Sequence, residues 1–289
     1  MKKIHRRHFL TQTALGLGSA MLWSSWPGKL LAEGLPNFTD IPLGFQTFPI
    51  RDRLGKDFPG ALKMMAGFGY KLTELCSPVG YADIGFGFLS KLKTKEIRMI
   101  IKDSGLDCPS CHFGKTELEP ANLGKTLEFA HAMGFSQIVC SSFDLPESAG
   151  LKDYLENAEL LNKAAEQIKK TGMETGFHNH EREFARLDGQ LIYDALISHF
   201  EPGLVKMQFQ TEVINLGFKA SDYFNKYPGR FISSHLSDWT ADKKEAPLGQ
   251  GVIDWKEYFA AAKTGGVKNF FVEMNFDKFE QSSRYIQSL

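Results

Sequence analysis

Residues 173–180 read METGFHNH, a short apolar run that ends in two imidazoles, His178 and His180, where turn residues normally follow a strand. The same unit, a strand-like run followed by an amphipathic helical stretch, occurs eight times along the chain. Regular alternation of strands and helices predicts a parallel sheet covered by helices. Eight repeats in a chain of 289 residues favour a single-domain (β/α)₈ TIM barrel over an open sheet.

Most of the strand-like runs end in side chains that bind metals or move protons. Because the carboxyl ends of parallel strands meet at one mouth of a barrel, we expect these side chains in a single site. In chain order they are Glu74, His112, His178, His180, Gln210, His235, Asp238 and Glu273. Helices are expected near residues 57–68, 90–104, 120–133, 151–171, 188–200, 220–227 and 254–264, with a terminal helix from about 277.

Composition limits the partners of the chain. It carries 34 basic and 34 acidic residues and a formal net charge of zero, so it shows no electrostatic footprint for nucleic acid or an anionic membrane. We therefore expect a neutral or small ligand. The exposed faces of the predicted helices are too mixed to identify a dimer surface, which leaves the oligomeric state open.

The N-terminus is typical of an export signal. Arg6 and Arg7 precede the apolar stretch ALGLGSAMLW, an arrangement that resembles a twin-arginine (Tat) signal peptide. The alternative is an amphipathic N-terminal helix, which the glycines of this stretch would weaken. The stretch is too short to predict a permanent membrane helix. We therefore predict a signal over residues 1–32, a barrel domain over 33–289 and a periplasmic protein, tethered to the membrane if the signal is not cleaved.

Cys108 and Cys111 form a C-x-x-C pattern, which elsewhere marks redox or zinc sites. Here the pattern lies inside a predicted strand, with no helix start beside it to lower a thiol pKa. A role in the core or at the strand end is therefore favoured over redox chemistry. The chain contains four cysteines, and no disulfide pairing follows from their spacing.

Several of the polar residues have ordinary structural explanations when taken singly. Glu74 could be a salt-bridged loop residue, and His112 could cap a turn or line the mouth. Arg230 could bind an anionic group or pair with an acid. The HNH run at 178–180 is different, because adjacent polar groups in a strand are costly unless a cavity or a partner satisfies them.

The residue types at the strand ends predict a metal site. Imidazole, carboxylate and amide oxygen suit Mn²⁺, Co²⁺ or Zn²⁺, with Mg²⁺ a further candidate. Such a cation is a Lewis acid for the oxygens of a sugar, while tuned carboxylates or imidazoles move the proton of the neighbouring carbon. Side-chain alternation places His178 with His180, and Gln208 with Gln210, on common strand faces. The segment WTADKKEAPLGQG (239–251) is expected to fold over the mouth.

Four motifs carry a resemblance to a known family: HNHEREF (178–184), YPGRFISSHLSDW (227–239), GQGVIDW (249–255) and GVKNFFVEM (266–274). They resemble the xylose-isomerase-like TIM barrel superfamily, in particular the bacterial sugar phosphate isomerase/epimerase group. The resemblance extends, in order, over nearly the whole chain after the signal. It implies a metal-dependent barrel that acts on sugars or sugar-like polyols. Endonuclease IV, a DNA-repair enzyme, shares this fold, but the neutral charge argues against DNA.

The resemblance also implies roles for individual residues. His235 and Glu273 match the family's metal-binding histidine of the seventh strand and glutamate of the eighth. At the fifth strand His178 replaces a glutamate, and at the sixth Gln210 replaces an aspartate, so the site is less anionic than in relatives. The implied metal ligands are His178, Gln210, His235 and Glu273, the implied catalytic residues are Glu273, His178 and Glu74, and the implied substrate-binding residues are His112, His180, Gln208, Arg230 and Asp238.

These departures remove one carboxylate of the family's proton-transfer pair, for which Glu74, Glu183 or a histidine could substitute. The expected function is a metal-dependent, isomerase- or epimerase-like enzyme that moves a proton next to a carbonyl of a non-phosphorylated sugar or keto-glycoside in the periplasm. One alternative is 3-keto-glycoside lyase or hydratase chemistry at the same site. The other is a catalytically silent sugar-binding barrel, which the lost charge at Gln210 motivates.

Overall fold

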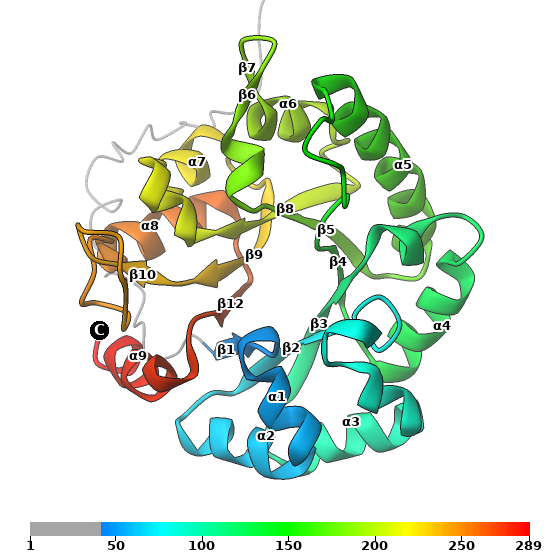
Figure 1. Cartoon of the computed structure of the whole chain (residues 1–289), viewed down its shortest axis with the longest axis vertical. Coiled ribbons are helices and arrows are strands. Elements are labelled where there is room, and N and C mark those ends of the chain that lie inside the picture. The colour runs from blue at the N-terminus through cyan, green and yellow to red at the C-terminus, as the bar shows by residue number, and fades with distance from the viewer. Residues whose placement is uncertain (1–41) are drawn as a thin grey trace, which may run out of the picture. The chain divides into compact units, whose positions relative to one another are not determined.

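The computed structural model of the protein describes residues 42–289, which form a closed barrel of eight parallel strands (Figure 1). The strands are β1 (Leu43–Gln46), β2 (Leu72–Cys76), β3 (Asp107–Phe113), β4 (Gln137–Cys140), β5 (Glu174–His178), β8 (Val205–Gln210), β9 (Phe231–Leu236) and β12 (Asn269–Val272). Around the barrel they follow the order β1-β12-β9-β8-β5-β4-β3-β2, and β1 closes the ring by pairing with both β12 and β2. The (β/α)₈ prediction is confirmed. The predicted signal over residues 1–32 and the domain start at residue 33 lie outside the described residues.

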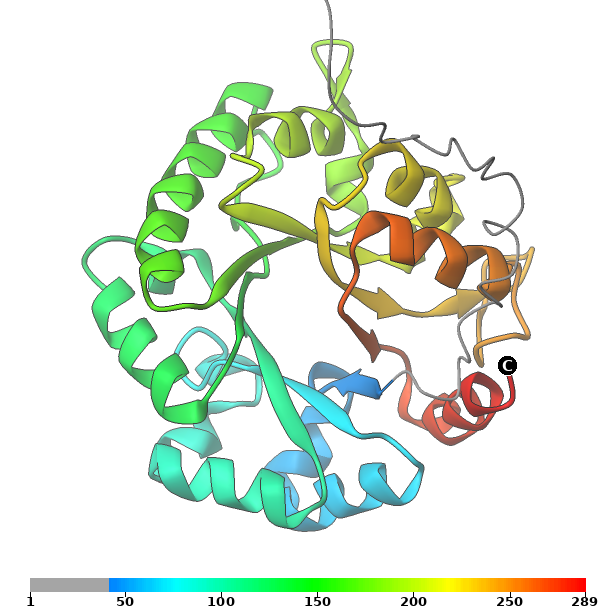
Figure 2. The ribbon, with the colours of Figure 1, turned by 180° about the vertical axis from the view of Figure 1, so that it is seen from behind.

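Helices surround the barrel, as two opposite views show (Figure 1, Figure 2). They are α1 (Arg51–Lys56), α2 (Phe58–Gly67), α3 (Thr94–Asp103), α4 (Leu123–Met133), α5 (Leu151–Lys170), α6 (Ile192–His199), α7 (Ala220–Lys226), α8 (Trp255–Gly265) and α9 (Phe279–Gln287). Each helix expected from the sequence is found near its predicted bounds. Within residues 42–289, no helix is both long and apolar enough to cross a membrane.

Three further elements are not anticipated by the sequence pattern. One is α1, a short helix before α2. The others are the hairpins β6–β7 (Arg186–Leu187 and Gln190–Leu191) and β10–β11 (Asp238–Trp239 and Glu245–Ala246). Strands of two residues are too short to show a period of alternation, so their pairing is not readable from the sequence.

The long helix α5 shows why the helices form where they do. Leu161, Ala165 and Ile168 follow one another at spacings of four and three residues, and all three are buried. Glu166 and Lys169, which lie between and beside them, are exposed. The helix therefore buries an apolar stripe against the barrel and leaves its charges in water.

A layer of polar side chains lies inside the barrel, below the carboxyl ends of the strands. It consists of Gln46, Glu74, Ser110, Gln208 and Ser233, all with no exposed surface. Glu74 bonds with Gln46, Ser110 and Gln208, and Gln208 also donates to Ser233. Because buried polar groups are costly without partners, this saturated layer fixes the side chains that lie on it.

The four cysteines are free thiols. Cys111 lies in β3 with no exposed surface, and Cys108 is half-buried at the start of the same strand. Burial raises the pKa of the Cys111 thiol well above its usual range. A thiol that stays protonated and inaccessible fits the predicted core role and not redox chemistry.

Candidate functional site

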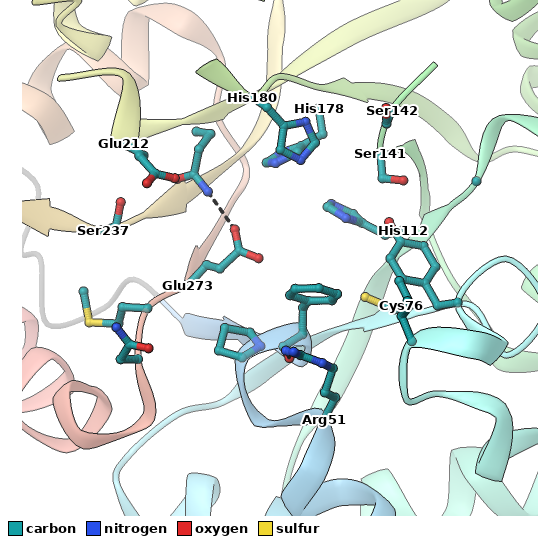
Figure 3. A pocket seen from close by; sticks show the side chains of 18 of the residues that line it. Arg51, Cys76, His112, Ser141, Ser142, His178, His180, Glu212, Ser237 and Glu273 are labelled. Atoms are coloured by element: carbon teal, nitrogen blue, oxygen red, sulfur yellow. Dashed lines mark hydrogen bonds between the residues drawn. The ribbon is translucent and has the colours of Figure 1, made fainter. Parts of the chain in front are cut away.

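A cavity of about 850 Å³ opens at the carboxyl ends of the strands (Figure 3). Residues from the strand ends form its floor, and residues from the following loops form its wall. Its lining includes Phe48, Arg51, Asp52, Cys76, Tyr81, His112, Ser141, Asp144, His178, His180, Arg182, Gln210, Glu212, Ser237, Trp239, Glu245 and Glu273. This is the mouth at which the sequence places the site.

Three buried histidines meet at the floor of this cavity. His112 comes from β3, His178 from the end of β5 and His235 from β9, and none exposes more than 5% of its surface. One ring nitrogen of each lies within 4.8 Å of one from each of the other two. The ring centroid of His235 is 5.1 Å from that of His112 and 4.5 Å from that of His178. Three imidazoles at this spacing could hold a metal ion.

Two polar atoms near the histidines also favour a cation. The Nδ1 atom of His178 and the Oε1 atom of Gln210 are buried and form no hydrogen bond with any described residue. An unpaired buried polar atom costs about 1–3 kcal/mol. The oxygen of Gln210 carries lone pairs, and Nδ1 of His178 carries one when the ring is protonated at Nε2, so the residues present fit a divalent cation.

Glu273 lies at the edge of the histidine cluster, one residue after β12. Its Oε2 atom accepts hydrogen bonds from Gln210 Nε2 at 2.7 Å and from His235 Nδ1 at 2.8 Å; the first bond is drawn in Figure 3. Its Oε1 atom receives no hydrogen bond from the described residues. Glu273 therefore presents one carboxylate oxygen to the cavity while the other is held in place.

Glu74 lies beneath the histidines and does not line the cavity. Its Oε2 atom is 2.5 Å from His235 Nε2 and 3.2 Å from His112 Nε2. His112 Nε2 is also 2.6 Å from Gln208 Oε1. Two of the three histidines are thus fixed from below by the polar layer.

The charges of this centre are set by burial and by one another. Burial by itself would raise the pKa of Glu74, but His112 and His235 outweigh it and hold the pKa well below its usual range. Burial would lower the pKa of His235, yet Glu273 and Glu74 raise it to about 9. Burial opposes ionisation of Glu273 too, and His235 nevertheless lowers its pKa. For His178, burial and the neighbouring histidines all lower the pKa, so its ring is neutral near pH 7.

The structure brings together most of the residues predicted for the site. His112, His178, His180, Gln210 and Glu273 line the cavity. His235, Glu74 and Gln208 lie directly beneath, in contact with them. Two predictions are corrected here, because neither side chain reaches the cavity. Glu74 was predicted to be catalytic, and Gln208 was predicted to contact the substrate.

Asp238 was predicted to bind substrate, and its environment is different. It has no exposed surface and does not line the cavity. Its carboxylate accepts hydrogen bonds from the backbone of Gly249 and Gly251 and from the indole of Trp255. Backbone N–H groups of Trp239 and Ile253 complete the set. Asp238 therefore fixes the loop after β11 instead of contacting substrate.

Arg230 was also predicted to bind substrate, and it lies at the wrong end of the barrel. It immediately precedes β9, whereas the cavity opens at the carboxyl ends of the strands. Its Nη2 atom donates to the backbone oxygen of Phe200 at 3.1 Å. A substrate in the cavity cannot reach it.

Loop residues at the cavity wall were not predicted. Trp239 and Glu245 come from the β10–β11 hairpin, within the segment expected to fold over the mouth. Glu212 lies two residues after Gln210, in the 3-10 helix that follows β8. Burial raises its pKa to about 7, with a further contribution from nearby acids that include Glu273. Its spacing of two from Gln210 is the one sequence signal that could have identified it.

The chain belongs to the xylose isomerase-like TIM barrel family, whose sequence model matches residues 62–289. This match confirms the resemblance carried by the four motifs. Among solved structures, the chain is similar to a sugar phosphate isomerase/epimerase from Parabacteroides distasonis. The two are 25% identical, with a TM-score of 0.71, and the similarity covers 85% of this chain and 93% of that one.

Two more distant structures share the fold. A xylose isomerase-like TIM barrel protein from Mycobacterium smegmatis, solved in complex with magnesium, is 14% identical, with a TM-score of 0.62 and coverage of 87% of this chain and 97% of that one. A D-psicose 3-epimerase, solved in the presence of D-fructose, is also 14% identical, with a TM-score of 0.59 and coverage of 80% and 92%. No curated protein sequence matches the chain.

Proposed function

We propose that this protein is a metal-dependent enzyme of the isomerase or epimerase type that moves a proton next to a carbonyl of a non-phosphorylated sugar or keto-glycoside. The observation that carries the proposal is the cluster of His112, His178 and His235 at the cavity floor, with Glu273 at its edge. Family membership supports the sugar class, because a structural relative is a D-psicose 3-epimerase solved with D-fructose.

The metal would be held by His178 and His235, with His112, Gln210 and Glu273 within the same centre. Imidazole donors suit Zn²⁺ and Co²⁺, and the amide and carboxylate oxygens extend the choice to Mn²⁺ or Mg²⁺. When bound, a divalent cation supplies Lewis acidity for negative charge that develops beside a carbonyl. The unpaired Nδ1 of His178 supports its assignment as a ligand.

Proton transfer is assigned to Glu273 and a fifth-strand histidine. The lowered pKa of Glu273 keeps the carboxylate ionised near pH 7, and its Oε1 atom is free to accept a proton from a substrate carbon. His180 is exposed within the cavity and is the neighbouring group able to exchange a proton with substrate. Bonds to Oε2 hold Glu273 in one orientation, which is what a general base requires.

The lining charges favour a neutral substrate over a sugar phosphate. Asp52, Asp144, Glu212, Glu245 and Glu273 give five carboxylates, against the guanidinium groups of two arginines. One of these, Arg182, is committed to Tyr154 and to the backbone of Leu145 and Pro146. The other is Arg51, so the lining carries more carboxylates than guanidinium groups, which favours a neutral substrate over a phosphate. A non-phosphorylated substrate also fits the periplasmic location that the Tat-like N-terminus predicts.

Lyase or hydratase chemistry on a 3-keto-glycoside is the second candidate. Two-sided isomerisation needs a second acid or base, and this role would fall to His180, because neither Glu74 nor Glu183 can serve. Glu74 has no exposed surface, and Glu183 exposes 3% and accepts the backbone N–H of His180. With Glu273 as the main base, one-sided abstraction followed by elimination or hydration uses fewer groups. A silent sugar-binding barrel remains the outcome if no metal binds, since Gln210 supplies no charge.

Solvent exchange at carbon tests the proposal. The purified protein, loaded with Zn²⁺, Co²⁺ or Mn²⁺ and incubated in D₂O with keto-sugars and 3-keto-glycosides, is expected to incorporate deuterium next to the carbonyl. Product analysis then separates isomerisation from elimination. Stoichiometric metal by elemental analysis with no exchange on any substrate would contradict the proton-transfer role. Absence of metal after reconstitution would favour the sugar-binding barrel.

A further inference from the structure

Glu74 is the point at which five strands of the barrel meet through side chains. Its carboxylate is fully buried. Oε1 accepts from Ser110 Oγ at 2.5 Å and from Gln208 Nε2 at 2.8 Å. Oε2 accepts from Gln46 Nε2 at 2.8 Å and from His235 Nε2 at 2.5 Å. These partners lie on β1, β3, β8 and β9, while Glu74 itself lies on β2.

The identity of each donor in this network follows from Glu74 being a carboxylate. An ionised carboxylate can only accept hydrogen bonds, so every group that faces it must donate. Gln208 therefore turns its amide nitrogen toward Glu74, and the same nitrogen donates to Ser233 Oγ at 2.8 Å. The amide oxygen of Gln208 is then left to face His112, whose Nε2 atom lies 2.6 Å away.

Both histidines above Glu74 consequently carry a proton on Nε2. His235 also donates from Nδ1 to Glu273, and this second proton would have to leave before Nδ1 could bind a metal. His112 Nε2 faces two acceptors, Gln208 Oε1 and Glu74 Oε2, so this nitrogen carries a proton. His235 Nε2 faces Glu74 Oε2 directly and carries a proton for the same reason. When Nε2 is protonated, Nδ1 is the ring nitrogen that can offer a lone pair to a metal.

We propose that Glu74 is a positioning residue that makes Nδ1 the ligating nitrogen of both His112 and His235. It acts on His235 by direct contact and on His112 through the orientation of Gln208. This inference rests on the proposed function only in taking these histidines as part of a metal centre. It explains why a costly buried carboxylate lies under a cavity that it does not enter, since outer partners of metal-binding histidines set tautomer and ring orientation.

Replacing Glu74 by glutamine turns one of its two acceptors into a donor. If the new amide nitrogen takes the place of Oε2, it faces His235 Nε2 and removes that acceptor. If it takes the place of Oε1, Gln208 must rotate and present its own amide nitrogen to His112. In the first orientation His235 loses the acceptor for its Nε2 proton. In the second, His112 loses its nearer acceptor, Gln208 Oε1, and keeps only the oxygen of residue 74 at 3.2 Å.

A matched control exists on the same chain. Glu117 exposes 6% of its surface and accepts from Ser77 Oγ at 2.7 Å and from the Gly114 N–H at 2.8 Å. It therefore resembles Glu74 in burial and in being hydrogen-bonded, but none of its hydrogen bonds involves the three histidines. A Glu117→Gln variant carries the same chemical change without the proposed effect on tautomers.

Two measurements test the inference on the full chain. Long-range ¹H–¹⁵N spectra of the metal-free protein are expected to show His112 protonated at Nε2 in the wild type and in Glu117→Gln. With Zn²⁺ bound, both His112 and His235 should show a protonated Nε2 and a zinc-bound Nδ1. In the Glu74→Gln variant, one of these two histidines should instead carry its proton on Nδ1. Zinc affinity should fall by about 10–100-fold in Glu74→Gln and by less than about threefold in Glu117→Gln.

The outcomes separate this inference from the proposed function. A His112 protonated at Nδ1 in the wild type, or zinc affinity and spectra unchanged in Glu74→Gln, would overturn the positioning role. If the wild type binds no zinc, the metal centre fails, while the metal-free spectrum of His112 still decides whether Glu74 sets the tautomer. Circular dichroism of each variant, compared with the wild type, establishes that it is folded.

Discussion

Replacing Asp238 by asparagine tests whether this buried carboxylate fixes the loop or serves the substrate. Five donors converge on it: the N–H groups of Gly249 and Gly251 and the indole of Trp255 on Oδ2, and the N–H groups of Trp239 and Ile253 on Oδ1. An asparagine keeps one acceptor atom and replaces the other by an amide nitrogen, which itself donates. At best, the amide oxygen serves the three donors on Oδ2.

The two donors on Oδ1 then face a donor. Each buried donor left without an acceptor costs about 1–3 kcal/mol, and the three remaining hydrogen bonds lose the strength that a charged acceptor confers. We therefore expect Asp238→Asn to lower the free energy of unfolding by about 3 kcal/mol. Because the side chain does not line the cavity, zinc affinity should stay within about threefold of the wild type. This change is smaller than the loss of about 10–100-fold expected when a partner that orients a metal-binding histidine is removed.

Urea unfolding followed by circular dichroism measures the first quantity, and Asp254→Asn is its control. Asp254 is exposed and caps α8 by accepting from the N–H groups of Lys256 and Glu257 at 3.0 Å. Asparagine caps helices about as well as aspartate, so this variant should lose less than about 0.5 kcal/mol. A loss below about 1 kcal/mol for Asp238→Asn, or weaker sugar binding at unchanged stability, would refute the loop-fixing role.

Three further predictions follow from the same structure. Burial raises the pKa of Glu183 to about 7, so its contribution to stability is full below about pH 4.5 and is lost as the pH rises through about 7. In urea unfolding, Glu183→Gln should therefore be more stable than the wild type by about 3 kcal/mol at pH 8. At about pH 4.5 the two proteins should be nearly equal in stability. Glu273→Gln removes the proposed base and should slow deuterium incorporation by about 10²–10⁴-fold at an unchanged circular dichroism spectrum. Free Zn²⁺ at a hundred times its dissociation constant should raise the melting temperature by about 5–10 °C, and replacing His235 by alanine should abolish that shift.

The fold was predictable because its signals are local. Each strand and helix shows its own period, as in α5, and eight repeats leave few topologies besides a closed barrel. The same logic identified the histidines at the cavity floor, since the end of a strand such as β5 leads to the mouth wherever the strand lies in the ring. The β10–β11 hairpin shows no such period: its segment was expected at the mouth, but the pairing of its strands was not predictable.

The depth of a side chain within the site, and the direction in which it points, do not follow from the local sequence. Glu74 lies two residues before the end of β2, so its side chain points into the barrel below the cavity, whereas His178 is the last residue of β5. Asp238 lies beyond the end of β9, where the hairpin and not the strand decides which way it faces. Arg230 precedes β9, and its position at the amino end could have excluded it from the sequence alone.

The metal centre formed by His112, His178 and His235 is the central claim, and anomalous X-ray diffraction at the zinc edge tests it most directly. Crystals of the zinc-loaded protein are expected to show one strong peak at the cavity floor, with nitrogens of the three histidines at about 2.0–2.1 Å. A side-chain oxygen of Gln210 or Glu273 should complete the coordination. A peak elsewhere on the chain, or none at the cavity floor, would contradict the account.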